Sequence, residues 1–422
     1  MPQPALPSPT ASSSSPKRWR VLVVATLQQA GLTFVRFGLP TVAPFLRSDL
    51  HLSLAQTGVV LGAFDLGALA AFYATGLATE RWGEGRVMAS GALVTALFTA
   101  LAALSPSVGL VTLALALGGL GFPSSQVAGS QAVMGWFPPR ERGVAMGVRQ
   151  AGLPVGGLVA AWLLPWLAAS WGWRIALVVA SVGCGLAGAV TYWALGPTPS
   201  LRGRVLRPTG SVRRSPVGFL RSPPLMLTTM TACLLAAGQY ALTGYLPLYF
   251  VDTFRWRAQD AARLLLFVHL GGIAGRMVWG WVSDRHFGGD RPRPMALAAC
   301  CAAATVLALA LLSRWPRVPV GLAVLLALLA GFTLLGWNGL YVTLISELAW
   351  GAGAVAVGLS MTVLYVFTMM APPAFGWAVE RAGSSYPAAW LGVVVLQLCA
   401  AATILFVPRV RRAPAGAFQP GD

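Results

Sequence analysis

The chain has 422 residues, of which 56% are hydrophobic and only 10% are charged, and its formal net charge is +18. Soluble domains carry about 25% charged residues, so the composition excludes a soluble globular protein and predicts a polytopic all-α membrane protein. The arginines lie in short stretches between apolar segments and not on one soluble face, which argues against nucleic acid as a partner.

Several kinds of chemistry are also excluded by composition. Lys17 is the only lysine, so the chain has neither a G-x-x-x-x-G-K-[ST] phosphate loop nor an internal lysine for a Schiff base. The five cysteines fall in apolar segments without the spacing of a metal site or a disulfide framework. We therefore predict that the protein is not an enzyme and needs no cofactor and no metal.

Twelve apolar segments approach or exceed the roughly 20 residues that a bilayer-spanning helix needs. They are predicted at 21–46, 54–78, 87–105, 108–133, 144–169, 173–195, 225–250, 260–282, 295–312, 318–344, 352–378 and 387–408. The predicted organisation is a disordered tail at 1–20, a six-helix bundle at 21–195, a linker at 196–224, a second six-helix bundle at 225–408 and a tail at 409–422.

The distribution of positive charge predicts the orientation of these spans. With the N-terminus in the cytoplasm, 19 of the 30 Lys and Arg residues fall in cytoplasmic segments, eight fall outside and three lie within the membrane. Cytoplasmic loops carry an excess of Lys and Arg. We therefore expect a multi-pass protein of the cytoplasmic (inner) membrane, with both tails and the linker in the cytoplasm.

The two halves of the sequence repeat a loop motif. G-L-A-T-E-R-W-G-E-G (Gly76–Gly85) follows the second span, and G-W-V-S-D-R-H-F-G-G (Gly280–Gly289) follows the eighth, 204 residues later. Both fit G-x-x-x-[DE]-R-x-x-x-G. Internal duplication of this kind is typical of secondary transporters, which bind substrate between their repeats near the middle of the membrane.

The paired loop motif, the twelve spans and W-F-P-P-R-E-R-G (Trp136–Gly143) resemble the major facilitator superfamily. The resemblance covers residues 17 to 412 and implies two six-helix halves that rock about a central site. It also implies a cytoplasmic latch in which Glu80 and Asp284 cap neighbouring helix ends and pair with arginines. The alternative is that these charges only set the topology. The gating motif residues are Gly76, Glu80, Arg81, Gly280, Asp284 and Arg285.

Asp65 is the only acid placed in mid-membrane, and the 204-residue offset maps it onto His269. Both groups can titrate near neutrality when buried, so they are the predicted proton-coupling residues. Arg36 lies at the same predicted depth as Asp65, which predicts an ion pair. That pair is either purely structural or is opened by substrate or a proton during transport. For His269 the alternative is a hydrogen-bonded packing residue.

Arg149 and Arg276 lie six or seven residues inside the cytoplasmic ends of spans five and eight. Three internal arginines against one acid predict a positive cavity, and guanidinium binds carboxylate bidentately. Arg276, eight residues before Asp284, resembles the anion-binding arginine of monocarboxylate and oxalate/formate porters. R-Q-A-G (149–152) and G-W-N-G (336–339) look like organic-anion and cyanate-type porters. The alternative is that these arginines snorkel to the cytoplasm.

Polar residues of the cavity-type helices complete the candidate site. Each of them could hydrogen-bond a substrate or bridge two helices. They are Gln28, Gln29, Gln239, Tyr240, Asn338, Tyr341 and Tyr365. Glu347, at the cytoplasmic end of span ten, is predicted to be a gate residue.

We predict a secondary active transporter of a small organic anion, most simply a carboxylate, coupled to protons and acting as a monomer in the lipid bilayer. The alternatives are a drug/proton antiporter and a membrane sensor that binds ligand without moving it. A sensor usually needs a sizeable cytoplasmic signalling module, which the short predicted tails and linker do not offer.

Overall fold

The computed structural model describes residues 16–52, 54–196, 216–349, 352–383 and 385–408. Within this part of the chain twelve helical segments are long and apolar enough to cross a membrane, as predicted. The described residues form helices and connecting turns with no strand, so the all-α fold is confirmed. The predicted tails and linker lie largely outside the described residues.

The first six spans lie in the N-terminal half and the other six in the C-terminal half. The N-terminal spans are α1 (Pro16–Asp49), α2 (Leu54–Trp82), α3 (Glu84–Leu104), the group α4 (Val108–Gly119), α5 (Pro123–Gln126) and α6 (Ala128–Trp136), then α7 (Arg142–Trp171) and α8 (Trp173–Leu195). After α9 (Pro216–Leu220) come α10 (Pro223–Phe254), α11 (Ala258–Arg285), α12 (Pro292–Leu312), the pair α13 (Val320–Leu334) and α14 (Asn338–Leu348), then α15 (Gly353–Arg381) and α16 (Tyr386–Leu405).

The fourth and tenth spans are interrupted, which the sequence prediction of continuous helices missed. In span four, Pro123 removes an amide donor from the helix, and the Thr95 hydroxyl donates to the Gly118 carbonyl at 2.8 Å. In span ten, the indole of Trp337 donates to the Leu334 carbonyl at 2.9 Å. Such side-chain donors allow a helix to break inside a membrane, where water is absent.

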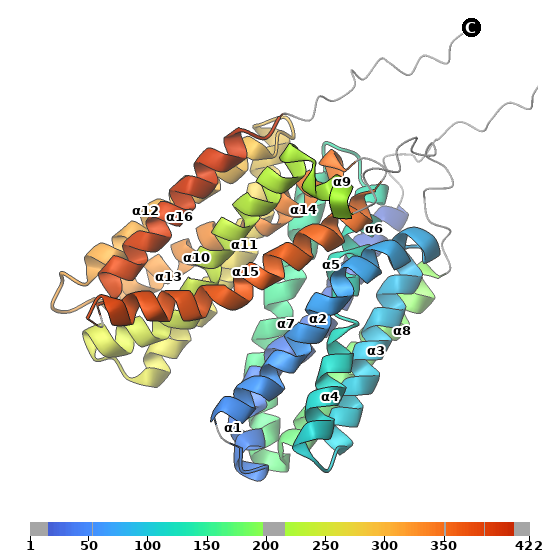
Figure 1. Cartoon of the computed structure of the whole chain (residues 1–422), viewed down its shortest axis with the longest axis horizontal. Coiled ribbons are helices and arrows are strands. Elements are labelled where there is room, and N and C mark those ends of the chain that lie inside the picture. Colours follow the sequence, from blue (N-terminus) through green and yellow to red (C-terminus); the bar gives the residue numbers. More distant parts are fainter. Residues whose placement is uncertain (1–15, 53, 197–215, 350–351, 384, 409–422) are drawn as a thin grey trace, which may run out of the picture.

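The two halves lie against each other through two helix pairs (Figure 1). α7 packs against α11, and α2 packs against α15. In Figure 1 the blue-green half and the yellow-red half meet at the end where α1 begins and α16 ends, and their ribbons diverge toward the other end. We call the first end the termini end. Arg18, near the start of α1, forms an ion pair of 2.8 Å with Glu141 there.

Glycines allow the closest approach of the two halves at the termini end. A Cβ atom at Gly143 of α7 would lie 2.6 Å from the Gly280 carbonyl oxygen of α11. A Cβ atom at Gly76 of α2 would lie 2.9 Å from the Ala354 carbonyl oxygen of α15. Both first glycines of the repeated motif thus pack on the start of a helix in the opposite half. Small residues let membrane helices touch through their backbones.

Candidate functional site

The Arg36–Asp65 pair joins α1 to α2 in the N-terminal half. Arg36 Nε lies 2.7 Å from Asp65 Oδ1, so the pair predicted from equal depth is present. The Arg36 side chain is 10% exposed and the Asp65 side chain 33% exposed. A carboxylate that remains accessible beside a buried guanidinium can exchange its proton or its partner, whereas a fully enclosed pair would be fixed.

Aromatic rings surround the Arg36 guanidinium. Its Cζ lies 5.0 Å from the ring centroid of Phe122 and 5.2 Å from that of Tyr365. Tyr365 belongs to α15 and also packs on Phe72 of α2, with centroids 4.6 Å apart. Tyr240 of α10 is near enough to interact electrostatically with Arg36. The predicted residues Arg36, Tyr365 and Tyr240 therefore meet where the halves face each other, and cation–π contacts hold the guanidinium in place.

Arg276 of α11 is the second cation of this central region. Its side chain is buried, with the residue 1% exposed, and Nε and Nη1 have no hydrogen-bond partner among the described residues. It interacts electrostatically with Tyr240, which links it to the Arg36 group. A buried charge without a partner is costly. Arg276 is therefore a site that an anion would neutralise.

His269 lies near Arg276 on α11, as their seven-residue spacing predicts. The two interact electrostatically, and His269 Nδ1 is buried without a hydrogen-bond partner among the described residues. In the same half Asn338 Nδ2 donates to Gln239 Oε1 at 3.1 Å. This bond joins α14 to α10, so the predicted pair of polar residues bridges two helices and leaves further hydrogen-bonding capacity.

Arg149 takes a different position from the other two arginines. It is fully buried in the N-terminal half, where its guanidinium donates to the Ser125 carbonyl in α5 and approaches the Met146 sulfur. These contacts stabilise the interruption of span four. The described contacts do not bring Arg149 to Arg36 or Arg276, so its predicted role in substrate binding gains no support from this arrangement.

The second copy of the loop motif ties the halves together at the termini end. Asp284 Oδ2 accepts a hydrogen bond of 2.9 Å from the Val144 amide, in the first turn of α7. Asp284 Oδ1 lies 2.5 Å from Arg291, whose Nη2 donates to the Pro139 carbonyl of the N-terminal half at 3.2 Å. These are the contacts that the latch prediction requires, because a carboxylate caps a helix start and pairs with an arginine. The role of these residues as a latch stays a prediction.

Glu347 of α14 extends this network, and its gate role stays a prediction. It lies 3.5 Å from Arg291 and 4.0 Å from Arg142 of α7, so it too reaches across the halves. Arg81 and Arg285 are exposed. Gly76 packs on α15, but residues 350–351, just before that helix, lie outside the described residues, and the capping role of Glu80 stays a prediction.

The sequence reasoning missed Arg291, which has the central place in the latch. A signal was available, because both copies of the loop carry a further arginine. Arg86 follows Glu80 by six residues, and Arg291 follows Asp284 by seven. The partners of Arg291 in the other half could not be read from this spacing.

The comparisons with known proteins agree with this architecture. The family model described as Major Facilitator Superfamily matches residues 25–354. The chain belongs to the major facilitator superfamily. Members of this family are transporters and not enzymes, so the protein is a multi-pass membrane transporter.

Three similar proteins are informative. An uncharacterized MFS-type transporter of Mycobacterium tuberculosis is 29% identical over 403 residues, covering 94% of this chain and 86% of the relative. The hexuronate transporter of Bacillus subtilis is 24% identical over 412 residues, covering 90% of this chain and 92% of the relative. The solved proton:xylose symporter XylE has a TM-score of 0.74 at 15% identity, covering 93% of this chain and 96% of that chain, and shows the shared fold.

Proposed function

We propose that this transporter is a secondary active carrier of a small organic anion, a carboxylate, coupled to protons. The observation that carries the proposal is Arg276, a buried guanidinium with two nitrogens that lack hydrogen-bond partners in the described part of the chain. Guanidinium binds carboxylate through two parallel hydrogen bonds. Hexuronate, the substrate named for the Bacillus subtilis relative, is a sugar carboxylate, and this supports the same substrate class here.

Arg36 and Asp65 supply the proposed proton coupling. While Asp65 is ionised it holds Arg36 at 2.7 Å. Protonation of Asp65 removes the charge that competes for Arg36, which then becomes available to the anion. Substrate and proton therefore bind together, because the binding of each makes the binding free energy of the other more favourable. Tyr240 lies close to both arginines and would orient the substrate between them.

The contacts of Asp284 and Arg291 support one assignment of this state within the proposed cycle. Asp284 and Arg291 hold the halves together at the termini end. We propose that this end faces the cytoplasm and that the protein lies in the cytoplasmic membrane, because the predicted cytoplasmic segments carry 19 of the 30 Lys and Arg residues. The state is then closed to the cytoplasm and accepts substrate from outside.

Uptake into proteoliposomes tests the proposal. Radiolabelled galacturonate and a panel of monocarboxylates are offered with and without an inward proton gradient, to wild type and to Arg276→Ala. We expect gradient-stimulated uptake by wild type and loss of at least about 100-fold in the variant, since a buried charge pair contributes roughly 3–5 kcal/mol. The control is Arg314→Gln, which replaces an exposed arginine between α12 and α13. Export of cationic dyes without carboxylate uptake would instead identify a drug/proton antiporter.

A further inference from the structure

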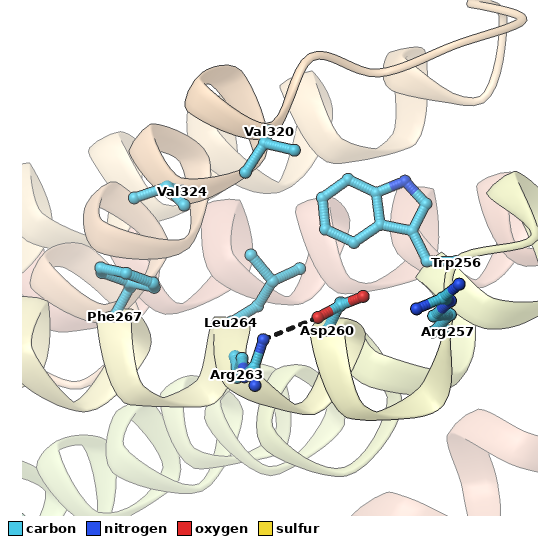
Figure 2. A pocket seen from close by; sticks show the side chains of 8 residues that line it. All are labelled: Trp256, Arg257, Asp260, Arg263, Leu264, Phe267, Val320 and Val324. Atoms are coloured by element: carbon cyan, nitrogen blue, oxygen red, sulfur yellow. Dashed lines mark hydrogen bonds and ion pairs between the residues drawn. The ribbon is translucent and has the colours of Figure 1, made fainter.

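A hollow lies in the C-terminal half, at the end opposite the termini end. Its volume is about 490 Å³, and it lies between the beginnings of α11 and α13 (Figure 2). Residues on both helices and just before α11 form its walls: Trp256, Arg257, Asp260, Arg263, Leu264, Phe267, Val320 and Val324. None of them belongs to the transport site described above.

The hollow is a wedge between two helices that touch deeper in the membrane. A Cβ atom at Gly271 would collide with the Leu328 carbonyl of α13, and one at Gly331 would collide with the Val268 carbonyl of α11. Outward from this contact the helices leave space between them. In Figure 2, Phe267 and Val324 close the inner end, and Trp256 stands at the outer end.

The hollow faces away from the transport site. Successive residues of a helix are rotated by about 100°, so Asp260, Leu264 and Phe267 share one face of α11, and His269 and Arg276 lie on nearly the opposite face. The face of the hollow continues to Val278, an apolar residue of the span that is 39% exposed. The other half packs on the opposite face of α11, where Gly147 and Gly143 of α7 meet the backbone at Arg276 and Gly280. The exposed Val278 therefore lies on the side of the span away from the other half, and a hollow on this side opens toward the bilayer.

The walls of the hollow change from apolar at the inner end to charged further out, as a phospholipid changes from acyl chain to headgroup. The inner end is lined by the apolar side chains Phe267 and Val324, and Val320 lies midway, level with Leu264. The charged side chains Arg263, Asp260 and Arg257 follow α11 outward from there (Figure 2). Neither α11 nor α13 has a side-chain cap at its start, so both helix starts add partial positive charge. Trp256 stands where tryptophan is enriched in membrane proteins, at the level of the headgroups.

The charges near the outer end comprise two cations and one anion. Arg263 pairs with Asp260 Oδ1 at 2.8 Å, and the side chains of both are well exposed, at 69% and 47%. Arg257 adds a second positive charge beside them. A ligand that matches this pattern carries a phosphate next to a positive group that can donate hydrogen bonds.

We propose that the hollow binds one phospholipid whose headgroup carries a phosphate and a primary ammonium, as in phosphatidylethanolamine. The phosphate lies beside Arg257 at the start of α11, the ammonium donates to Asp260, and an acyl chain lies along Phe267 and Val324. A purely anionic headgroup meets the Asp260 carboxylate unfavourably. A quaternary ammonium cannot donate a hydrogen bond to Asp260.

Native mass spectrometry of the full chain released from detergent measures this binding directly. The protein is mixed with equal amounts of phosphatidylethanolamine, phosphatidylglycerol and phosphatidylcholine of identical acyl chains. We expect the ethanolamine adduct to exceed each of the others about fivefold, the upper range for exposed ion pairs. Asp260→Asn should bring the ethanolamine and choline adducts to equal abundance, and Arg257→Gln with Arg263→Gln should lower all three.

The matched control is Arg314→Gln, which removes an exposed arginine outside the hollow in the same half. It should leave the lipid preference of wild type unchanged. Equal binding of the three lipids by wild type would overturn the proposal, as would a preference for phosphatidylglycerol or a preference that survives Asp260→Asn. The substituted side chains are exposed, so these variants should fold and elute like wild type on size exclusion. The readout does not depend on transport, so it is independent of the proposed substrate.

Discussion

Replacing Asp284 with asparagine tests whether the latch sets the equilibrium between the state closed at the termini end and the state open there. The Asp284 carboxylate is 6% exposed and makes two contacts, with Arg291 in its own half and with the Val144 amide in the other half. Only contacts between the halves change when the termini end opens. The Val144 bond therefore biases the equilibrium directly, and the Arg291 pair does so only by positioning the arginine.

The expected size of the effect follows from these contacts. A hydrogen bond to a charged group contributes about 1.5–3 kcal/mol and one between neutral groups about 1 kcal/mol. The Asp284→Asn variant thus loses about 1 kcal/mol at the Val144 amide, and somewhat more as the bond from Arg291 to the Pro139 carbonyl loosens. A total of about 1–2 kcal/mol corresponds to a shift of about 5- to 30-fold toward the state open at the termini end.

Spin labels placed on both halves at the termini end measure this shift. In a background lacking the five native cysteines, labels at Arg86→Cys and Arg293→Cys report the separation of the halves by electron–electron double resonance. We expect Asp284→Asn to populate a longer distance that wild type lacks. Arg314→Gln, which replaces an exposed arginine at the other end of the same half, is the control. A distance distribution that stays unchanged in Asp284→Asn would refute the latch.

Three further outcomes are expected. Gly280→Ala should abolish transport without loss of folded protein, because the added Cβ atom would collide with a backbone carbonyl of α7. Uptake and thermal unfolding are measured. The control is Gly392→Ala, where nothing lies within 4 Å of the added atom. Asp65→Asn should remove the stimulation of uptake by an inward proton gradient, and stimulation that persists would exclude this carboxylate as the coupling group. Tyr365→Leu should raise KM about 2- to 30-fold, since one cation–π contact with Arg36 contributes about 0.5–2 kcal/mol; an unchanged KM would place Tyr365 outside the substrate path.

The sequence predicted what depends on depth and periodicity. Arg36 and Asp65 lie at equal distances from the outer ends of their spans, and the structure pairs them. Counting internal charges indicated that arginines outnumber acids in the membrane, and Arg276 is indeed buried without an acid among its described contacts. The family resemblance implied that Asp284 caps a neighbouring helix end, and Asp284 accepts a hydrogen bond from the Val144 amide at the start of α7.

The sequence could not predict what depends on partners distant in the chain. The break in span four is satisfied by Thr95 and Arg149, which come from other helices. Arg291 reaches the Pro139 carbonyl 152 residues away. Arg149 has the same apparent signature as Arg276, an arginine a few residues inside a span. Only the fold separates them, by giving Arg149 the Ser125 carbonyl as a partner.

The uncompensated charge of Arg276 makes the reorientation of the empty carrier sensitive to the membrane voltage. An elementary charge that crosses the whole membrane field gains or loses about 2.3 kcal/mol per 100 mV, and a guanidinium whose access changes from one side to the other crosses part of that field. The resting voltage of the cell therefore acts on the reorientation of the unloaded protein. In the proposed cycle a bound monocarboxylate adds one negative charge while protonation of Asp65 removes one. The loaded protein then keeps the net charge of the empty one, so its reorientation responds to voltage as well.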